Sequence, residues 1–345
     1  MKQANNNTLA SDILKYNATK GPKYMVVADA IQSAINGGRL NKGDMLPSVK
    51  VLANDINASP ETVFKAYNIL KEQGTISSVP SKGYYISEQI EKVFVLLDTF
   101  KAYKEVLYDA LTKNLPKNII ADVNFHHYKP EIFRKLIEES LGKYTKWIIM
   151  PFMNDTVKAT MTLLEPQKLL VIDWNIYVPE GASILYQDFG KSLYDGLNSV
   201  LHLIKKYDEI HFLYPEYTQH PHQSVEAFEC FCKKEKIRYL VEENSEDFAV
   251  RRGVAYISVS DRLLGRFLQQ CRDNKFKVGQ DVGFISYNET PMKPFIDRGI
   301  TVFSTDFYTL GQEAAEFVKK GIHIEHCIPS KMIIRLSASP DLLDP

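Results

Sequence analysis

The sequence predicts a mixed α/β protein with a small winged helix-turn-helix domain followed by a larger, two-lobed α/β body. Three patterns in its 345 residues support this organisation. Two short helices with clear start signals are separated by a tight turn, and two short strand-like segments follow them. Beyond residue 90, strand patterns alternate with helical patterns in two successive series. Such alternation is typical of parallel sheets covered by helices on both faces.

Residues 8–37 are expected to supply the first helix of the N-terminal domain. Apolar residues recur there at helical spacing, at Tyr24, Val27, Ala28, Ile31 and Ile35. The pair Gly37-Gly38 ends the pattern. We expect this helix to support the helix pair that follows it.

Residues 46–71 read as two helices joined by a turn at Asn57-Ala58. Ser48 is a good N-cap for the first helix, whose apolar residues are Val49, Leu52, Ala53 and Ile56. Ser59 caps the second helix, and Pro60 occupies its first position, where a missing N–H costs nothing. The buried stripe of the second helix is expected to be Val63, Ala66, Tyr67 and Leu70.

The other face of the second helix would then carry Glu61, Thr62, Phe64, Lys65 and Asn68. Gly74 follows as a C-cap, and residues 75–87 form two short strands around Ser81-Lys82-Gly83. Two helices and a hairpin make a winged helix, which would place the second helix in the major groove of DNA. The hairpin tip would reach the backbone or the minor groove. An ordinary helical hairpin with a solvated polar face is the alternative.

The residues around this helix pair favour the DNA-binding alternative. Residues 37–48 (GGRLNKGDMLPS) closely resemble the signature "G-x-L-x-x-G-D-x-L-P-S" of GntR-family regulators. Residues 62–67 (TVFKAY), with Leu70 and Gly74, resemble the family's "T-V-x-x-A-Y-x-x-L-x-x-x-G", especially in its YtrA-like branch. The resemblance covers about residues 20–87.

This resemblance implies a set of DNA-contacting residues, namely Lys50, Ser59, Glu61, Thr62, Phe64, Lys65, Lys82, Gly83 and Tyr84. Lys50 and Phe64 stand where the family usually or often has arginine, so its base preference does not carry over to this chain. Residues 1–90 carry a formal charge of +3 and the remainder −3. A weakly basic head fits contact with DNA by one end of the chain.

The body is expected to form two α/β lobes. The first series places strands at residues 92–97, 119–125, 146–151 and 168–173, and helices at 103–115, 131–144 and 155–164. The second places helices at 192–207, 223–236, 261–274 and 310–319, and strands at 209–214, 238–242, 254–259, 282–287, 299–304 and 331–336. Each series would build one sheet with helices on both faces.

A second resemblance covers roughly residues 91–340. Residues 278–289 (VGQDVGFISYNE) look like the "V-P-x-D-V-x-V-x-G-Y-D-D" stretch of LacI/GalR effector domains, and residues 259–261 and 334–337 match further segments in order. The resemblance implies a periplasmic-binding-protein-like (type I) fold with a ligand cleft between the lobes. A GntR head on a LacI-like body is the layout of AraR-type sugar-responsive repressors.

The cleft residues that this fold implies are Asp98, Phe100, Asn154, Trp174, Asp188, His222, Asp261, Asn288 and Glu289. They supply polar groups for hydroxyls and apolar surface for a sugar ring. The family's sugar-clamping arginine would align near Ser224 and is absent, so His220, His222 or Gln223 is the candidate replacement. Each position has the alternative of a solvated loop residue or a helix cap.

Other classes of protein fit the sequence less well. The HExxH, G-x-S-x-G and P-loop patterns of enzymes are missing, and no metal or cofactor site is expected. Some GntR heads precede aminotransferase-like bodies, but the cofactor-binding lysine motif of such bodies has no match here. The start of the chain does not read as a signal peptide, and no run is long enough to span a membrane. Four cysteines then suit a reduced, cytoplasmic protein.

The sequence thus predicts a DNA-binding domain at residues 1–87 and a two-lobed ligand-binding and dimerisation domain at residues 88–345. We expect a homodimeric repressor of carbohydrate-utilisation genes that binds double-stranded DNA at a palindromic operator. A small sugar, most simply a monosaccharide, would control it. A non-sugar metabolite or a protein partner as the signal, or an enzyme-like body, remain the alternatives.

Overall fold

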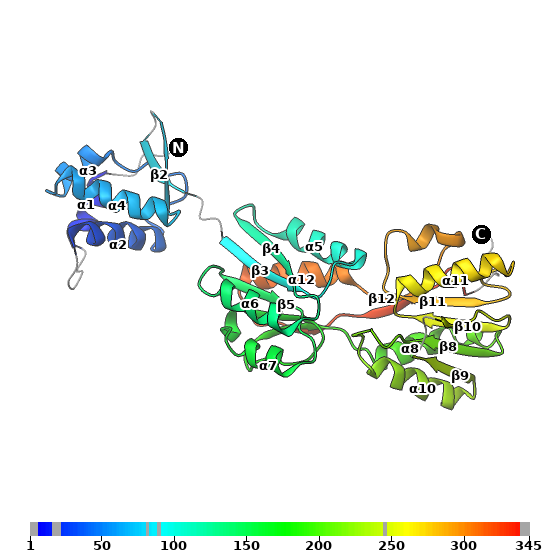
Figure 1. Cartoon of the computed structure of the whole chain (residues 1–345). Coiled ribbons are helices and arrows are strands. Elements are labelled where there is room, and N and C mark those ends of the chain that lie inside the picture. The colour runs from blue at the N-terminus through cyan, green and yellow to red at the C-terminus, as the bar shows by residue number, and fades with distance from the viewer. Residues whose placement is uncertain (1–5, 16–21, 81–82, 88–90, 244–246, 339–345) are drawn as a thin grey trace. The chain divides into compact units, whose positions relative to one another are not determined.

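The computed structural model describes residues 6–15, 22–80, 83–87, 91–243 and 247–338 (Figure 1). The chain forms two compact units. The smaller comprises residues 1–91 with 117–119, and the larger comprises residues 92–116 with 120–345. None of the helices in the described part of the chain combines the length and apolar character needed to cross a bilayer.

The described residues of the smaller unit form four helices and one hairpin. Its elements are α1 (Asn6–Lys15), α2 (Lys23–Asn36), α3 (Val49–Asp55), α4 (Pro60–Glu72), β1 (Ile76–Val79) and β2 (Gly83–Ile86). The hairpin strands are antiparallel, with Ile76 opposite Ile86. The single helix predicted for residues 8–37 is wrong, because the chain forms two helices there. The sequence Gly21-Pro22 is typical of a turn or loop and predicts a helix boundary at this point. Pro22 is the N-cap residue of α2.

The helix-turn-helix forms as its local signals predict. The Ser48 hydroxyl accepts a hydrogen bond from the Val51 amide at 3.3 Å, and the Ser59 hydroxyl accepts one from the Thr62 amide at 3.2 Å. Asn57 in the turn has φ 49°, a conformation that asparagine tolerates better than most residues. Gly74 follows the end of α4 with φ 73°, as a helix-ending glycine should.

Tyr67 of α4 connects the parts of the small core. Its buried hydroxyl donates to the carbonyl oxygen of Pro47 at 2.9 Å, and its ring meets that of Tyr84 on the hairpin edge-on, 4.7 Å between centroids. Burial raises the pKa of Tyr67. The predicted stripe of α4 is buried throughout, and Leu9, Ala10 and Ile13 of α1 join the same core. Helix α1 is therefore an integral part of this unit.

The larger unit contains two six-stranded sheets. The first lobe has the strand order β13-β7-β6-β5-β3-β4, and the second has β14-β12-β11-β10-β8-β9. The first-lobe strands are β3 (Glu91–Leu97), β4 (Ile119–Phe125), β5 (Lys146–Ile149), β6 (Leu169–Asp173), β7 (Ser183–Tyr186) and β13 (Glu325–Cys327). The second-lobe strands are β8 (Glu209–Leu213), β9 (Arg238–Glu242), β10 (Val254–Ser258), β11 (Gly283–Tyr287), β12 (Thr301–Thr305) and β14 (Ser330–Ile333). β14 runs antiparallel to β12, whereas β8 to β12 pair in parallel.

Helices connect these strands much as the sequence predicts. They are α5 (Ala102–Asn114), α6 (Pro130–Ser140), α7 (Asp155–Met161), α8 (Lys191–Ser199), α9 (Leu201–Ile204), α10 (Gln223–Glu235), α11 (Asp261–Asp273) and α12 (Phe307–Lys320), with 3₁₀ turns η1 (Pro166–Lys168) and η3 (Lys293–Arg298). The helix predicted for residues 192–207 is instead two, α8 and α9, separated at Val200. The strands β7 and β13 were not predicted.

The chain passes between the lobes three times, after β7, after β12 and between β13 and β14. These three segments are hydrogen-bonded to one another. The Ile328 amide donates to the Tyr186 carbonyl at 2.6 Å. The Thr305 hydroxyl donates to the Gln187 side-chain oxygen at 2.7 Å and lies 2.7 Å from the Ser330 hydroxyl. The crossovers therefore form one connected hinge.

Helix α12 returns to the first lobe and packs against α5 (Figure 1). Gly311 lies at their contact, where an added Cβ would collide with the Leu107 carbonyl oxygen and approach the Ala110 Cβ to 2.8 Å. Gly265 offers a matched control, because it lies within α11 and an added Cβ would meet nothing within 4 Å.

We predict that Gly311→Ala destabilises the larger unit by about 2–3 kcal/mol, because the collision involves backbone that cannot move aside cheaply. Gly265→Ala should instead stabilise it by roughly 0.5–1 kcal/mol. Urea unfolding followed by tryptophan fluorescence measures this unit alone, since Trp147 and Trp174 both lie in it. Equal unfolding midpoints for the two variants would contradict the close packing of α5 and α12.

Candidate functional site

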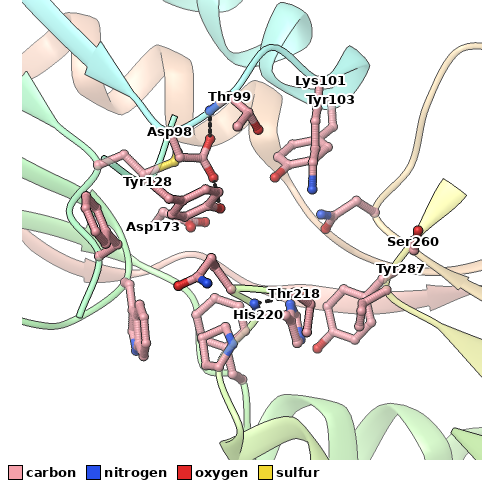
Figure 2. Close-up of a pocket in the computed structure, with 18 of the residues that line it drawn as sticks. Asp98, Thr99, Lys101, Tyr103, Tyr128, Asp173, Thr218, His220, Ser260 and Tyr287 are labelled. Carbon is pink, nitrogen blue, oxygen red and sulfur yellow. Dashed lines mark hydrogen bonds between the residues drawn. The ribbon is translucent and has the colours of Figure 1, made fainter. Parts of the chain in front are cut away.

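A cavity of about 400 Å³ lies between the two lobes of the larger unit (Figure 2). Segments that follow strands β3, β6 and β7 line it from the first lobe, and segments that follow β8, β10 and β11 line it from the second. Both sheets therefore direct the C-terminal ends of parallel strands at one space, which is where open α/β sheets bind ligands.

The first-lobe wall is built around Asp98, directly after β3. Its carboxylate accepts hydrogen bonds from the Thr99 amide and the Tyr128 hydroxyl (Figure 2). It also forms an ion pair with Lys104. Lys104 also donates to the Thr99 carbonyl at 3.1 Å. Asp98 is 5 % exposed and Lys104 2 %. Burial lowers the pKa of Lys104 to about 7. The negative charge of the nearby Asp173 acts in the opposite direction and raises this pKa.

His126 holds the loop that brings Tyr128 to Asp98. Its Nδ1 accepts a hydrogen bond from the Tyr128 amide at 3.1 Å, so Nε2 carries the proton and donates to the Met150 carbonyl at 3.0 Å. The imidazole stacks on Phe152, 4.8 Å between centroids. Burial lowers the pKa of His126 to about 4, so the ring is neutral near pH 7.

Asp173 is a second carboxylate at the cavity, at the end of β6. Its backbone has φ 78°, an uncommon conformation for a residue with a side chain. One oxygen accepts a hydrogen bond from the Gln187 amide group, and burial raises the pKa of Asp173. The oxygen of Gln187 in turn accepts from Thr305. A continuous hydrogen-bonded chain thus joins the cavity wall to the hinge.

Several polar atoms around the cavity are buried and have no hydrogen-bond partner among the described residues. They are Thr99 Oγ1, His220 Nε2, Tyr287 Oη and Asn288 Oδ1. The rings of His220 and Tyr287 lie 4.4 Å apart, edge to face. Burial lowers the pKa of His220 to about 3, so its imidazole is neutral near pH 7. A buried polar group without a partner costs on the order of 1–3 kcal/mol, which a polar ligand would recover.

Lys293 fixes the second-lobe wall. Its buried ammonium donates to the carbonyl oxygens of Tyr287 at 2.9 Å and Asn288 at 2.6 Å, and it pairs with Asp261 at 2.8 Å. Asn288 has φ 59° directly after β11. The loop that carries Asn288 and the start of α11 are therefore held by one cation.

Four of the nine cleft residues predicted from the sequence line the cavity, namely Asp98, Trp174, Asp261 and Asn288. The other five have different surroundings. Phe100 is 75 % exposed and contacts Phe125, Asn154 caps α7, Asp188 accepts from the Gly190 amide, Glu289 pairs with Arg335, and His222 is exposed beside Glu226. His220, one alternative to His222, does line the cavity.

Several cavity residues were not predicted from the sequence, notably Thr99, Lys101, Tyr103, Tyr128, Asp173, Gln187 and Tyr287. Asp173 and Tyr287 are the last residues of predicted strands, so the position at a strand end was a usable signal. Tyr128 follows His127, and both have positive φ. No sequence pattern indicates that this turn returns Tyr128 to Asp98.

The predicted DNA-contacting residues lie mostly on exposed surface of the smaller unit. Lys50, Ser59, Glu61, Phe64, Lys65 and Gly83 are exposed. Thr62 is half-buried, with its hydroxyl 2.8 Å from that of Ser59. Tyr84 packs against the core through Tyr67. Lys82 lies outside the described residues.

Comparison with known proteins finds a family model that matches part of each unit. Residues 23–86 match the model described as "Bacterial regulatory proteins, gntR family", and residues 200–337 match the "Periplasmic binding protein-like domain". The chain is 38 % identical over 74 residues to the HTH-type transcriptional repressor YtrA of Bacillus subtilis (strain 168), covering 21 % of this chain and 57 % of the relative. It is 33 % identical over 86 residues to the uncharacterized HTH-type transcriptional regulator YhcF of the same organism, covering 25 % of this chain and 69 % of the relative.

Solved structures resemble the larger unit. A LacI regulator from Lactobacillus casei with bound Tris superposes with a TM-score of 0.59 at 17 % identity, covering 72 % of this chain and 97 % of that one. A dimeric lac repressor with an 11-residue C-terminal deletion superposes with a TM-score of 0.60 at 13 % identity, covering 72 % of this chain and 98 % of that one. The fold is therefore that of LacI-type regulators. The chain spans only about half the length of the YtrA repressor.

We predict that His126 makes the free energy of unfolding fall with acidification. Between about pH 6.5 and 4 the unfolded chain binds a proton at this imidazole that the folded chain does not bind, so stability decreases as pH falls. From pH 7 to 5 this contribution amounts to about 2 kcal/mol. Urea unfolding at both pH values should show a smaller decrease for His126→Gln. His323→Gln, at an exposed site, should keep the wild-type decrease. Identical decreases in all three proteins would contradict the assignment.

Proposed function

Because this chain belongs to the gntR family of bacterial regulatory proteins, we propose that it is a transcription regulator whose larger unit binds a small sugar-type effector. The observation that carries the proposal is the set of buried, unpartnered polar atoms around a cavity that both lobes line. In this proposal residues 1–87 bind DNA, and residues 88–345 bind the effector and form the dimer.

The chemistry of the cavity favours a neutral polyhydroxylated ligand. Asp98 and Asp173 can accept hydrogen bonds from hydroxyl groups, and so can the free oxygen of Asn288. The Tyr287 hydroxyl can donate. Trp174 and Phe189 offer aromatic surface for the apolar face of a ring. A volume of about 400 Å³ suits a small ligand such as a monosaccharide.

DNA recognition is assigned to the helix-turn-helix of the smaller unit. Helix α4 would enter the major groove, with its capped N-terminus towards the bases. A related chain is named a transcriptional repressor, and one structural neighbour is a lac repressor dimer bound to operator. By analogy the chain acts in the cytoplasm as a homodimeric repressor on a palindromic operator, and its target genes concern carbohydrate use.

Regulation requires that the effector bind the DNA-bound and free states with different affinity. The hydrogen-bonded chain from Asp173 through Gln187 and Thr305 to Ser330 is a structural basis for such a difference, because it connects the ligand wall to all three crossovers. A sugar hydroxyl on Asp173 would compete with or reorient Gln187. The relative placement of the lobes would change with it.

A thermal-shift screen with D-glucose, D-ribose, sucrose and a wider set of monosaccharides tests the effector class. A sugar at about a hundred times its Kd should stabilise the larger unit by roughly 2.7 kcal/mol, or several degrees in Tm. Stabilisation by one sugar supports the proposal and identifies the effector. An unchanged Tm across the whole set would contradict a sugar-type effector.

We predict that Tyr287→Phe weakens binding of the sugar found in that screen roughly tenfold, because it removes one hydrogen bond in a closed cavity. Stability without sugar should not decrease, since none of the described residues is a hydrogen-bond partner of this hydroxyl. Titration followed by the fluorescence of Trp174 measures the affinity. Tyr207→Phe is the matched control, because the Tyr207 hydroxyl is also buried without a partner in the described part of the chain but lies outside the cavity. Equal affinities for both variants would exclude Tyr287 from the site.

We also predict that Lys50→Ala lowers the affinity of the full chain for random-sequence duplex DNA. The slope of the logarithm of the binding constant against the logarithm of the salt concentration should become shallower by about one. Lys50 is an exposed cation on α3, whereas Lys113 is an exposed cation on α5 of the larger unit. Lys113→Ala should therefore leave both quantities unchanged. Fluorescence anisotropy at several salt concentrations measures them. Unchanged values for Lys50→Ala would contradict the proposed DNA-binding face.

A further inference from the structure

Helix α4 has one large apolar side chain on the face opposite its buried stripe. Val63, Ala66 and Leu70 of the stripe are at most 1 % exposed, whereas Phe64 is 47 % exposed. Phe64 lies on the same face as Glu61, three residues earlier, and is followed by the exposed Lys65. The core therefore leaves about half of the Phe64 side chain open to solvent.

The polar groups beside Phe64 already have partners. Glu61 and Lys65 form an ion pair at 2.9 Å, which lowers the pKa of Glu61 and raises that of Lys65. The Thr62 hydroxyl lies 2.8 Å from that of Ser59, the N-cap residue. Helix α4 contains no arginine, the residue that most often reads guanine. In the first two turns Glu61 and Lys65 thus pair with each other, and Phe64 is an exposed side chain that has no polar group.

An apolar group in the major groove has one specific counterpart. Thymine carries a C5-methyl group there, and cytosine and adenine present no equivalent. A phenylalanine ring on the N-terminal half of a recognition helix is placed to contact such a methyl group, because this part of the helix approaches the base edges. The apolar contact would also remove the exposed ring from water.

We propose that Phe64 determines specificity by packing its ring against the methyl group of a thymine in each operator half-site. This inference rests on the proposed DNA-binding function and adds the base that the helix reads. Operator sites should then require thymine at one position per half-site. They should not show the dependence on guanine N7 and O6 that an arginine at residue 64 would impose.

The test begins with selection of bound sequences from a randomised DNA duplex library by the full chain. Each thymine of the selected site is then replaced singly by deoxyuridine, which keeps the base pair and removes only the methyl group. For the wild-type protein we expect one thymine per half-site whose replacement weakens binding by about fivefold or more. For Phe64→Ala the same replacement should change the affinity by less than about twofold, because the contact is already lost.

Two further variants separate the contact from general effects. Phe64→Leu keeps an apolar side chain and should retain part of the sensitivity to deoxyuridine. Lys50→Ala should weaken binding to every duplex and keep the full sensitivity, since a phosphate contact carries no base information. All variants should unfold at the wild-type urea concentration, because the altered side chains are exposed.

The outcomes distinguish this inference from the proposed function. A selected sequence with equal deoxyuridine penalties for wild type and Phe64→Ala, or with no thymine sensitive to the replacement, would overturn the thymine contact and leave DNA binding in place. A library that yields no enriched sequence would contradict sequence-specific DNA binding, and the thymine contact with it.

Discussion

The buried ion pair between Asp98 and Lys104 is the constraint on which the ligand cavity depends. Neither charge can stay in this site alone, since an unpaired buried charge costs on the order of 3–5 kcal/mol. The pair binds the end of β3 to the first turn of α5, and Tyr128 completes the coordination of the carboxylate. His126 then holds Tyr128 through its backbone amide. The first-lobe wall is thus already in place before a ligand arrives, and a hydroxyl that meets Asp98 finds its orientation fixed.

The second-lobe wall is likewise fixed by a buried lysine that pairs with an aspartate. Lys293 forms an ion pair with Asp261 and donates hydrogen bonds to the carbonyl oxygens of Tyr287 and Asn288. Each lobe therefore fixes its ligand-facing loops by a buried lysine that belongs to that lobe alone. The hydrogen bonds of the crossovers, among them Gln187 with Thr305, connect one wall to the other. Rigid walls on a hydrogen-bonded hinge allow the lobes to move as bodies, which is how two-lobed binding domains close.

The sequence predicted the helix-turn-helix in detail and the cavity only in part, for a physical reason. The signals for α3 and α4 are local, since Ser48, Ser59 and Pro60 act on the residues next to them. The cavity is assembled by loops, whose directions depend on distant contacts. Asp98 and Asn288 could be predicted because they directly follow strands, and ligands bind at the C-terminal ends of parallel strands. Phe100 and Glu289 lie only one or two residues further on, yet they turn away from the cavity. The strands β7 and β13 are short, and they depend on pairing with strands distant in the sequence, since β13 pairs with β7, which in turn pairs with β6.

In the proposed function, the polar cavity atoms that have no partner among the described residues would let an effector shift the equilibrium between lobe arrangements. Without ligand, an arrangement that buries His220, Tyr287 and Asn288 costs free energy, and an open arrangement would return these groups to water. A ligand that satisfies them stabilises the closed arrangement alone, which is the differential affinity that a population shift requires. An apolar molecule of equal size would fill the cavity and leave these groups unpaired. The same atoms that make a polar ligand specific for the cavity therefore also make its binding a switch.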